Sequence, residues 1–153
     1  MEKESFIYVS GHNGLVGSAI VRKLRYAGYK NIITVSKADL DLTKTNEVES
    51  FFSTNKIEYV FDAAAKVGGI HANDRYSAEF IYQNTMIQNN LIHSSFKNNI
   101  KKFLFLGSVC IYPKFAPTPV KEESLLCGEL ENTNEAYAIS KIHGIHLLKA
   151  YNK

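Results

Sequence analysis

Cysteine is scarce in this sequence, and long apolar runs and clusters of one charge are absent. The 153 residues include two cysteines, Cys110 and Cys127, which are too few for a disulfide framework and lack the CxxC spacing of a zinc site. No stretch approaches the roughly 20 apolar residues of a membrane span, and the start, MEKES, lacks the apolar segment of a secretory signal. We therefore expect a cytoplasmic protein with reduced thiols and no membrane partner.

Basic and acidic residues are scattered along the chain. The 18 basic and 15 acidic residues form neither a basic run nor a basic helix face with interleaved aromatics, so we expect no nucleic-acid partner. His12, His71 and His93 have no other candidate ligand at metal spacing, so we expect no metal site. The length and an apolar content of 45% predict one soluble globular domain, residues 1–153.

Short apolar runs alternate with amphipathic segments. Such alternation predicts a doubly wound parallel α/β sheet, Rossmann-like, because parallel neighbours need a long return connection. The expected strands are 6–10, 31–36, 40–42, 57–65 and 101–107, and the expected helices are 15–28, 44–55, 77–98 and 133–151.

The last expected strand contains FLFL, which is apolar on both faces. That pattern suits an interior strand, yet the chain supplies nothing to lie beside it. We therefore expect a sheet truncated before its last strands and before a substrate domain.

The segment GHNGLVG joins the first expected strand to the first helix. Its spacing is GxxGxxG, not GxGxxG, but glycines here would equally allow a tight turn and let backbone amides approach a pyrophosphate at the helix N-terminus. An ordinary glycine turn is the alternative. The predicted cofactor contacts in this segment are Gly11, Asn13, Gly14, Leu15, Val16 and Gly17.

The segment VSKAD after the second strand bears on the choice of cofactor. Lys37 precedes Asp39 and favours NADP(H) over NAD, since an acidic residue here would repel a 2′-phosphate. Alternatively, Lys37 is an ordinary surface lysine and Asp39 folds back toward the ribose.

The segment AAAKVGG follows the fourth expected strand. Small residues let a cofactor lie close to the backbone, and the loop after them could line a substrate pocket; a plain strand-to-loop junction is the alternative. The predicted cofactor contacts are Ala63, Ala64 and Ala65, and the predicted substrate contacts are Lys66, Val67, Gly68 and Gly69.

Tyr137 and Lys141 lie four residues apart, on one face of the last helix. A lysine ammonium near a phenol lowers its pKa, so the tyrosine could exchange a proton with a substrate oxygen. Ser108 ends the strand at 101–107, and strand alternation would place Cys110 on the same side. The alternative is that Ser108 caps the strand end and Cys110 packs as a small apolar residue.

These motifs resemble the extended short-chain dehydrogenase/reductase family. The segments AAAKVGGIHAN, FLGSVCIYPK, FIYQN and TNEAYAISKIHGI narrow the resemblance to GDP-L-fucose synthases, over essentially the whole chain. It implies NADPH-dependent epimerisation and reduction of GDP-4-keto-6-deoxymannose to GDP-L-fucose, by a homodimer. It also implies roles: Tyr137 as proton donor, Lys141 as its partner and ribose ligand, Ser108 as orienter of the carbonyl, and Cys110 as proton exchanger beside the keto group.

The sequence departs from this family pattern in two places. Asn13 occupies a position in the glycine turn where a basic residue would help hold the 2′-phosphate of NADP. The histidine that works with the cysteine lies downstream of the tyrosine helix, whereas His143 and His146 fall on that helix and cannot replace it. We therefore expect these 153 residues alone to be poor catalysts. Two rival functions remain: another nucleotide-sugar epimerase or reductase of the same fold, and a non-catalytic NADP-binding module.

Overall fold

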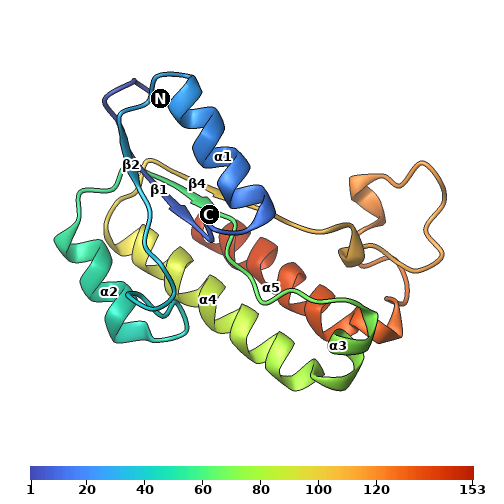
Figure 1. Cartoon of the computed structure of the whole chain (residues 1–153). Coiled ribbons are helices and arrows are strands. Elements are labelled where there is room, and N and C mark those ends of the chain that lie inside the picture. The colour runs from blue at the N-terminus through green and yellow to red at the C-terminus, as the bar shows by residue number, and fades with distance from the viewer. The chain divides into compact units, whose positions relative to one another are not determined.

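A computed structural model describes all 153 residues, and its contacts divide the chain into two compact units. The first unit comprises Met1–Ala65 and Met86–Leu106, and the second comprises Lys66–Thr85 and Gly107–Lys153. No helix is both long and apolar enough to cross a membrane. The strands are β1 (Phe6–Ser10), β2 (Asn31–Ile33), β3 (Tyr59–Asp62) and β4 (Lys102–Phe105); the helices are α1 (Leu15–Tyr26), α2 (Thr45–Thr54), α3 (Ile70–Arg75), α4 (Ser77–Lys97) and α5 (Glu135–Tyr151), with short 3₁₀ helices η1 (Val109–Ile111), η2 (Glu122–Ser124) and η3 (Asn132–Asn134) (Figure 1).

The four strands form one parallel sheet in the order β2-β1-β3-β4. The register places Ile7 beside Ile32 on one side and beside Tyr59 on the other. Within the first unit, α1 covers one face of this sheet, and α2 with the C-terminal part of α4 covers the other (Figure 1). The predicted doubly wound parallel α/β fold is therefore confirmed.

Alternation along β1 creates two separate apolar cores. Ile7 and Val9 point to one face, where they pack in a cluster with Val21 and Leu24 of α1. Tyr8 points to the other face and packs in the cluster that holds residues of α2 and α4, and its ring lies 4.9 Å from that of Phe51. A strand with apolar residues on both faces is what a parallel sheet between two helical layers requires.

The strand predicted at residues 40–42 is wrong. Leu40 donates its N–H to the Ser36 carbonyl at 3.0 Å, and the Asp41 carboxylate accepts hydrogen bonds from the Thr43 N–H at 3.0 Å and hydroxyl at 2.8 Å. These local bonds form a turn in place of a ladder, a competition typical of aspartate and threonine. The other strands exist, but each of the last three is shorter than predicted.

Helix α3 lies in a segment for which the sequence predicts only a polar loop. Its composition, IHANDR, shows no apolar period. The buried Asn73 side chain stabilises it by donating to the carbonyls of Gly68 at 2.8 Å and Gly69 at 3.1 Å. The Asn73 side chain thus links helix α3 to the loop before it by two hydrogen bonds.

Candidate functional site

The glycine turn between β1 and α1 has no room for side chains at two positions. Gly11 has φ of +66°, and a Cβ there would lie 2.5 Å from the Ala63 carbonyl oxygen. A Cβ at Gly17 would overlap the Gly11 carbonyl oxygen. The turn is closed by the Gly14 N–H, which donates to the Gly11 carbonyl at 2.9 Å. The backbone of this turn therefore packs directly against the residues after β3.

The N-terminus of α1 is open. Its N-cap residue, Gly14, offers no side-chain cap, and the first turn holds no acidic residue. Leu15 is 90% exposed, and Asn13 and Val16 are also exposed. The first N–H groups of a helix have no intrahelical partner and carry partial positive charge. This helix start therefore fits a phosphate group.

Two buried polar residues at the strand ends fix the alanines after β3. The Ser10 hydroxyl donates to Asp62 Oδ1 at 2.7 Å, and the Ala64 N–H donates to the same oxygen at 3.1 Å. Burial, and secondarily the Asp62 charge, raises the pKa of Tyr8 far above its usual value. Neither Ser10 nor Asp62 was predicted from the sequence, although each is a polar residue that ends an apolar strand.

Lys37 and Asp39 lie in the turns that follow β2, and both are exposed. The Asp39 carboxylate accepts a hydrogen bond from the Ser36 hydroxyl at 2.6 Å. The pKa of Asp41 is lowered mainly by the hydrogen bonds from Thr43, with smaller contributions from the charges of Lys37 and Lys44. Both carboxylates therefore have local partners.

In the second unit, Ser108 and Cys110 lie in a turn. Strand β4 ends at Phe105, and Ser108 is the N-cap of η1, where its hydroxyl oxygen accepts the Cys110 N–H at 3.3 Å. The sequence analysis expected strand alternation to place these two side chains on the same side. That reason is wrong, because residues 108–111 do not lie in a strand. Val109, between them, is 77% exposed.

The Tyr137 phenol interacts with the side chains of both Ser108 and Cys110. Burial raises the pKa of its phenol, a hydrogen bond with the Ser108 side chain partly opposes this, and the Cys110 charge adds to the rise. The predicted lowering of this pKa by Lys141 is not found: burial is the largest cause of the shift, and the Lys141 ammonium lies 6.0 Å from the Tyr137 ring centroid. The structure nevertheless brings Ser108, Cys110 and Tyr137 together, with Lys141 buried one helical turn away.

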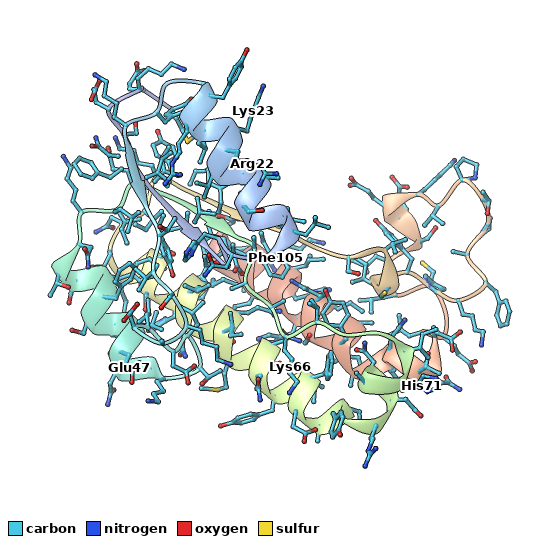
Figure 2. All side chains as sticks on the ribbon, in the orientation of Figure 1. Arg22, Lys23, Glu47, Lys66, His71 and Phe105 are labelled. Carbon is cyan, nitrogen blue, oxygen red and sulfur yellow. The ribbon has the colours of Figure 1, made fainter.

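The loop of residues 66–69 is held by an asparagine of α4. The fully buried Asn84 accepts the Lys66 N–H at 2.7 Å and donates to the Lys66 carbonyl at 3.0 Å. The Lys66 ammonium lies 5.5 Å from the Phe80 ring centroid, and a Cβ at Gly68 would lie 3.0 Å from Phe80 (Figure 2 labels Lys66). Val67 and Gly69 are exposed. Asn84 and Asn73 were not predicted from the sequence, because no local pattern marks a hydrogen bond from a side chain to the backbone of a loop.

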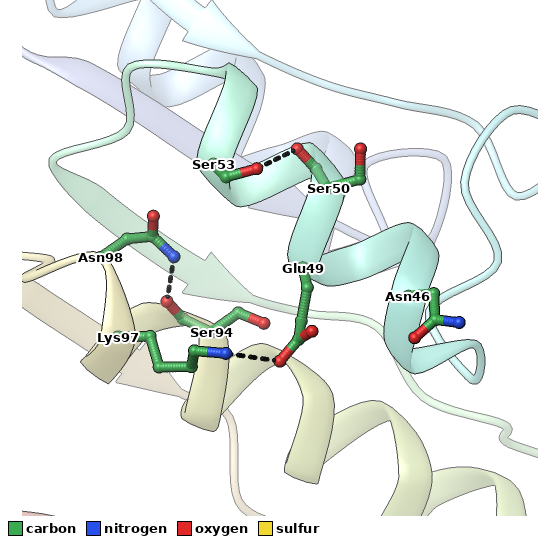
Figure 3. A pocket seen from close by; sticks show the side chains of 7 residues that line it. All are labelled: Asn46, Glu49, Ser50, Ser53, Ser94, Lys97 and Asn98. Carbon is green, nitrogen blue, oxygen red and sulfur yellow. Dashed lines mark hydrogen bonds and ion pairs between the residues drawn. The ribbon is translucent and has the colours of Figure 1, made fainter.

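The first unit also contains a groove that is lined by other residues. No three His, Cys, Asp or Glu side chains are placed to hold a metal ion. A groove of about 390 Å³ in the first unit has the Lys97 ammonium and Glu49 carboxylate paired at 2.8 Å (Figure 3). No predicted site residue lines it; its lining residues are Asn46, Glu49, Ser50, Ser53, Ser94, Lys97 and Asn98.

Comparisons with known proteins find close relatives. GDP-L-fucose synthase 1 from Arabidopsis thaliana is 58% identical over 150 residues, which cover 98% of this chain and 46% of that protein. GDP-L-fucose synthase from Escherichia coli (strain K12) is 50% identical over 147 residues, covering 96% and 46%. The resemblance to GDP-L-fucose synthases is therefore confirmed.

Solved structures agree with this result. A GDP-D-glycero-L-gluco-heptose synthase from Campylobacter jejuni, solved in the presence of NADPH, superposes with a TM-score of 0.96 at 43% identity, covering 99% of this chain and 45% of that one. The chain thus spans less than half the length of these relatives. A family model described as "NAD dependent epimerase/dehydratase family" matches residues 7–153, and the chain belongs to that family.

Proposed function

We propose that this chain carries the cofactor-binding and catalytic portion of an NADPH-dependent enzyme that epimerises and reduces GDP-4-keto-6-deoxymannose to GDP-L-fucose. The observation that carries the proposal is the meeting of Ser108, Cys110 and Tyr137. The identity of 50–58% to GDP-L-fucose synthases supports the choice of substrate.

The reduction needs a proton donor beside the carbonyl oxygen. The raised pKa of Tyr137 keeps the phenol protonated near neutral pH, which is the form that a donor requires. Ser108 would hold the carbonyl oxygen by a hydrogen bond, and Lys141 would bind the nicotinamide ribose. The nicotinamide, when bound, supplies the hydride.

The epimerisation needs a group that exchanges protons at the carbons flanking the ketone. The ketone acidifies those hydrogens, and a thiolate can accept one. Cys110 is half-buried, and a charge on its sulfur would raise the pKa of Tyr137. We assign this exchange to Cys110.

The residues of the first unit fit a dinucleotide. The Gly11–Gly17 turn and the open α1 N-terminus would hold the pyrophosphate, and Ala63, Ala64 and Ala65 would lie against the cofactor. The exposed Lys37 and the engagement of Asp39 by Ser36 support NADP over NAD. A GDP-L-fucose synthetase from Naegleria fowleri, 27% identical to this chain, was solved with NADP bound.

The decisive test is Tyr137→Phe in a protein that extends this chain to the length of its relatives. NADPH consumption with GDP-4-keto-6-deoxymannose should fall by about 10²–10⁴-fold, the typical contribution of a general acid. Tyr82→Phe, at an exposed tyrosine of α4, is the matched control and should leave the rate unchanged. Unchanged turnover by Tyr137→Phe would overturn the mechanism.

The cofactor preference has a separate test on this chain. Calorimetric titration of Lys37→Ala should show weaker NADP binding and unchanged NAD binding, because only NADP carries the 2′-phosphate. An equal loss for both nucleotides would contradict the role of Lys37.

A second candidate is a GDP-sugar reductase that does not epimerise. The 43% identity to a GDP-mannoheptose C4 reductase from Campylobacter jejuni favours it as the alternative. Such an enzyme would keep Ser108, Tyr137 and Lys141 but would not need Cys110. Cys110→Ser therefore separates the two functions: loss of deuterium exchange beside the ketone supports the first, and unchanged product formation from a heptose substrate supports the second.

A further inference from the structure

Asn134 occupies the N-cap position of α5 but does not cap the helix. Asparagine is favoured at this position because its side-chain oxygen accepts an N–H of the first helical turn. Here no side-chain capping bond forms, and the backbone has φ of −129° and ψ of 13°. The side chain is therefore turned away from the helix that it begins.

The Asn134 amide group instead faces Cys110. Its Nδ2 donates to Cys110 Sγ at 3.6 Å. Its Oδ1 is buried and has no hydrogen-bond partner. A buried acceptor without a partner costs free energy, and such atoms are rare in folded proteins. The position gives up a helix cap and leaves an oxygen unsatisfied, and it gains a contact with the sulfur.

We propose that Asn134 is a positioning residue for Cys110: its amide N–H stabilises the thiolate form, and its amide oxygen accepts a hydroxyl donor of the bound sugar. A hydrogen bond to a charged acceptor is stronger than one to a neutral acceptor, so the contact favours the thiolate over the thiol. The proposal rests on the proposed function, in which Cys110 exchanges protons as a thiolate.

Several titratable groups lie on the segments that carry Cys110, Asn134 and Tyr137. A charge on Cys110 would raise the pKa of the Tyr137 phenol, and the Lys141 ammonium lies 6.0 Å from the tyrosine ring centroid. The Lys114 ammonium, carried by the chain that leaves η1, is paired with the Glu131 carboxylate at 2.8 Å. Since the variants below leave these groups in place, a change in Cys110 reactivity reports on the amide.

The test is the alkylation rate of Cys110 by iodoacetamide in this chain, followed by mass spectrometry. Only the thiolate reacts, so the rate at about pH 7 divided by the rate at about pH 10 measures how strongly the thiolate is favoured over the thiol near neutral pH. Asn134→Leu removes the donor at similar size and should lower this ratio about three- to tenfold. Cys127 is exposed, lies outside the contact and should keep its ratio, so it is an internal control.

Asn134→Asp provides a second variant that protects the fold. Aspartate is as good an N-cap as asparagine, and it replaces the N–H donor by a negative charge. It should lower the ratio for Cys110 further than leucine does. An unchanged ratio in both variants would overturn the proposal. If the rates at both pH values change by the same factor, the ratio is unchanged and the variant has altered only access to the thiol.

A second measurement concerns the oxygen and uses the extended enzyme. With the GDP-4-keto sugar, Asn134→Leu should slow deuterium exchange beside the ketone about tenfold or more and raise KM, with a smaller effect on hydride transfer. An unchanged KM and exchange rate would overturn the sugar contact. The alkylation result needs no sugar turnover, so it stands or fails independently of the test on Tyr137.

Discussion

The two units of the chain hold their predicted site segments by different means. In the first unit, the glycine turn is fixed by backbone packed on backbone, with Gly11 against the Ala63 carbonyl. In the second, asparagine side chains bond to the backbone of a loop, as Asn84 does with Lys66. Close packing requires the absence of a side chain, whereas the second arrangement requires one particular side chain. Substitutions should therefore act in opposite ways: adding atoms damages the first unit, and removing polar atoms damages the second.

The largest effect is expected for Gly11→Ala. The new Cβ meets the Ala63 carbonyl in a left-handed conformation, so strain and overlap together should lower the free energy of unfolding by about 3 kcal/mol or more. Gly28→Ala is the matched control, because Gly28 has φ of +83° but no atom within 4 Å of the added Cβ. It should cost only about 1–2 kcal/mol in urea denaturation. Equal costs would show that contact with Ala63 is unimportant.

A smaller loss is expected for Asn84→Leu. The variant leaves the Lys66 N–H and carbonyl without partners, which should cost about 2–3 kcal/mol. Hydrogen exchange at the Lys66 amide should accelerate more than exchange in β1. Asn98→Leu is the control: its side chain is exposed and bonds only to the Ser94 carbonyl of the same segment, so the cost should be about 0.5 kcal/mol or less. A similar loss of stability in Asn84→Leu and Asn98→Leu would contradict the inference that the second unit depends on particular asparagine side chains.

The smallest effect concerns two tyrosines, one in each unit. The pKa values of Tyr8 and Tyr137 are both raised above the ordinary 10.0, that of Tyr8 by more. A raised pKa in the folded state means that stability is full below pH 10 and falls as the pH rises above it. Tyr8→Phe should remove more of this alkaline loss than Tyr137→Phe does.

Urea unfolding between about pH 8 and pH 11 measures this loss, since its slope with pH follows the difference in bound protons. The exposed Tyr26 supplies the control, and Tyr26→Phe should leave the slope unchanged. The same slope in Tyr8→Phe and Tyr137→Phe would mean that the two tyrosines contribute equally to the loss of stability at alkaline pH, contrary to this prediction.

The sequence predicted the first unit well, because its determinants are local. Alternating apolar residues in β1 and the spacing around α1 predict both elements, and close backbone packing explains why Gly11 and Gly17 are glycines. The strand predicted at 40–42 failed because an aspartate turn competes with the ladder.

The second unit was predicted less completely. The sequence selected Ser108, Cys110 and Tyr137 by motif and resemblance, but the geometry that joins them is a 3₁₀ turn, which strand alternation does not describe. Asn84 lies 18 residues from Lys66, and the contact of Asn134 with Cys110 spans 24 residues. A bond between a side chain and distant backbone or sulfur leaves no periodic trace in a single sequence.

The bonds between Asn84 and Lys66 involve only the main chain of Lys66. Any residue except proline at position 66 could make both of them, since every such residue has the same N–H and carbonyl. The course of the loop is therefore independent of the side chain that it displays. Position 66 can therefore change its charge or size while the backbone beside it stays in place, and what such a change removes is the contact between the Lys66 ammonium and the Phe80 ring.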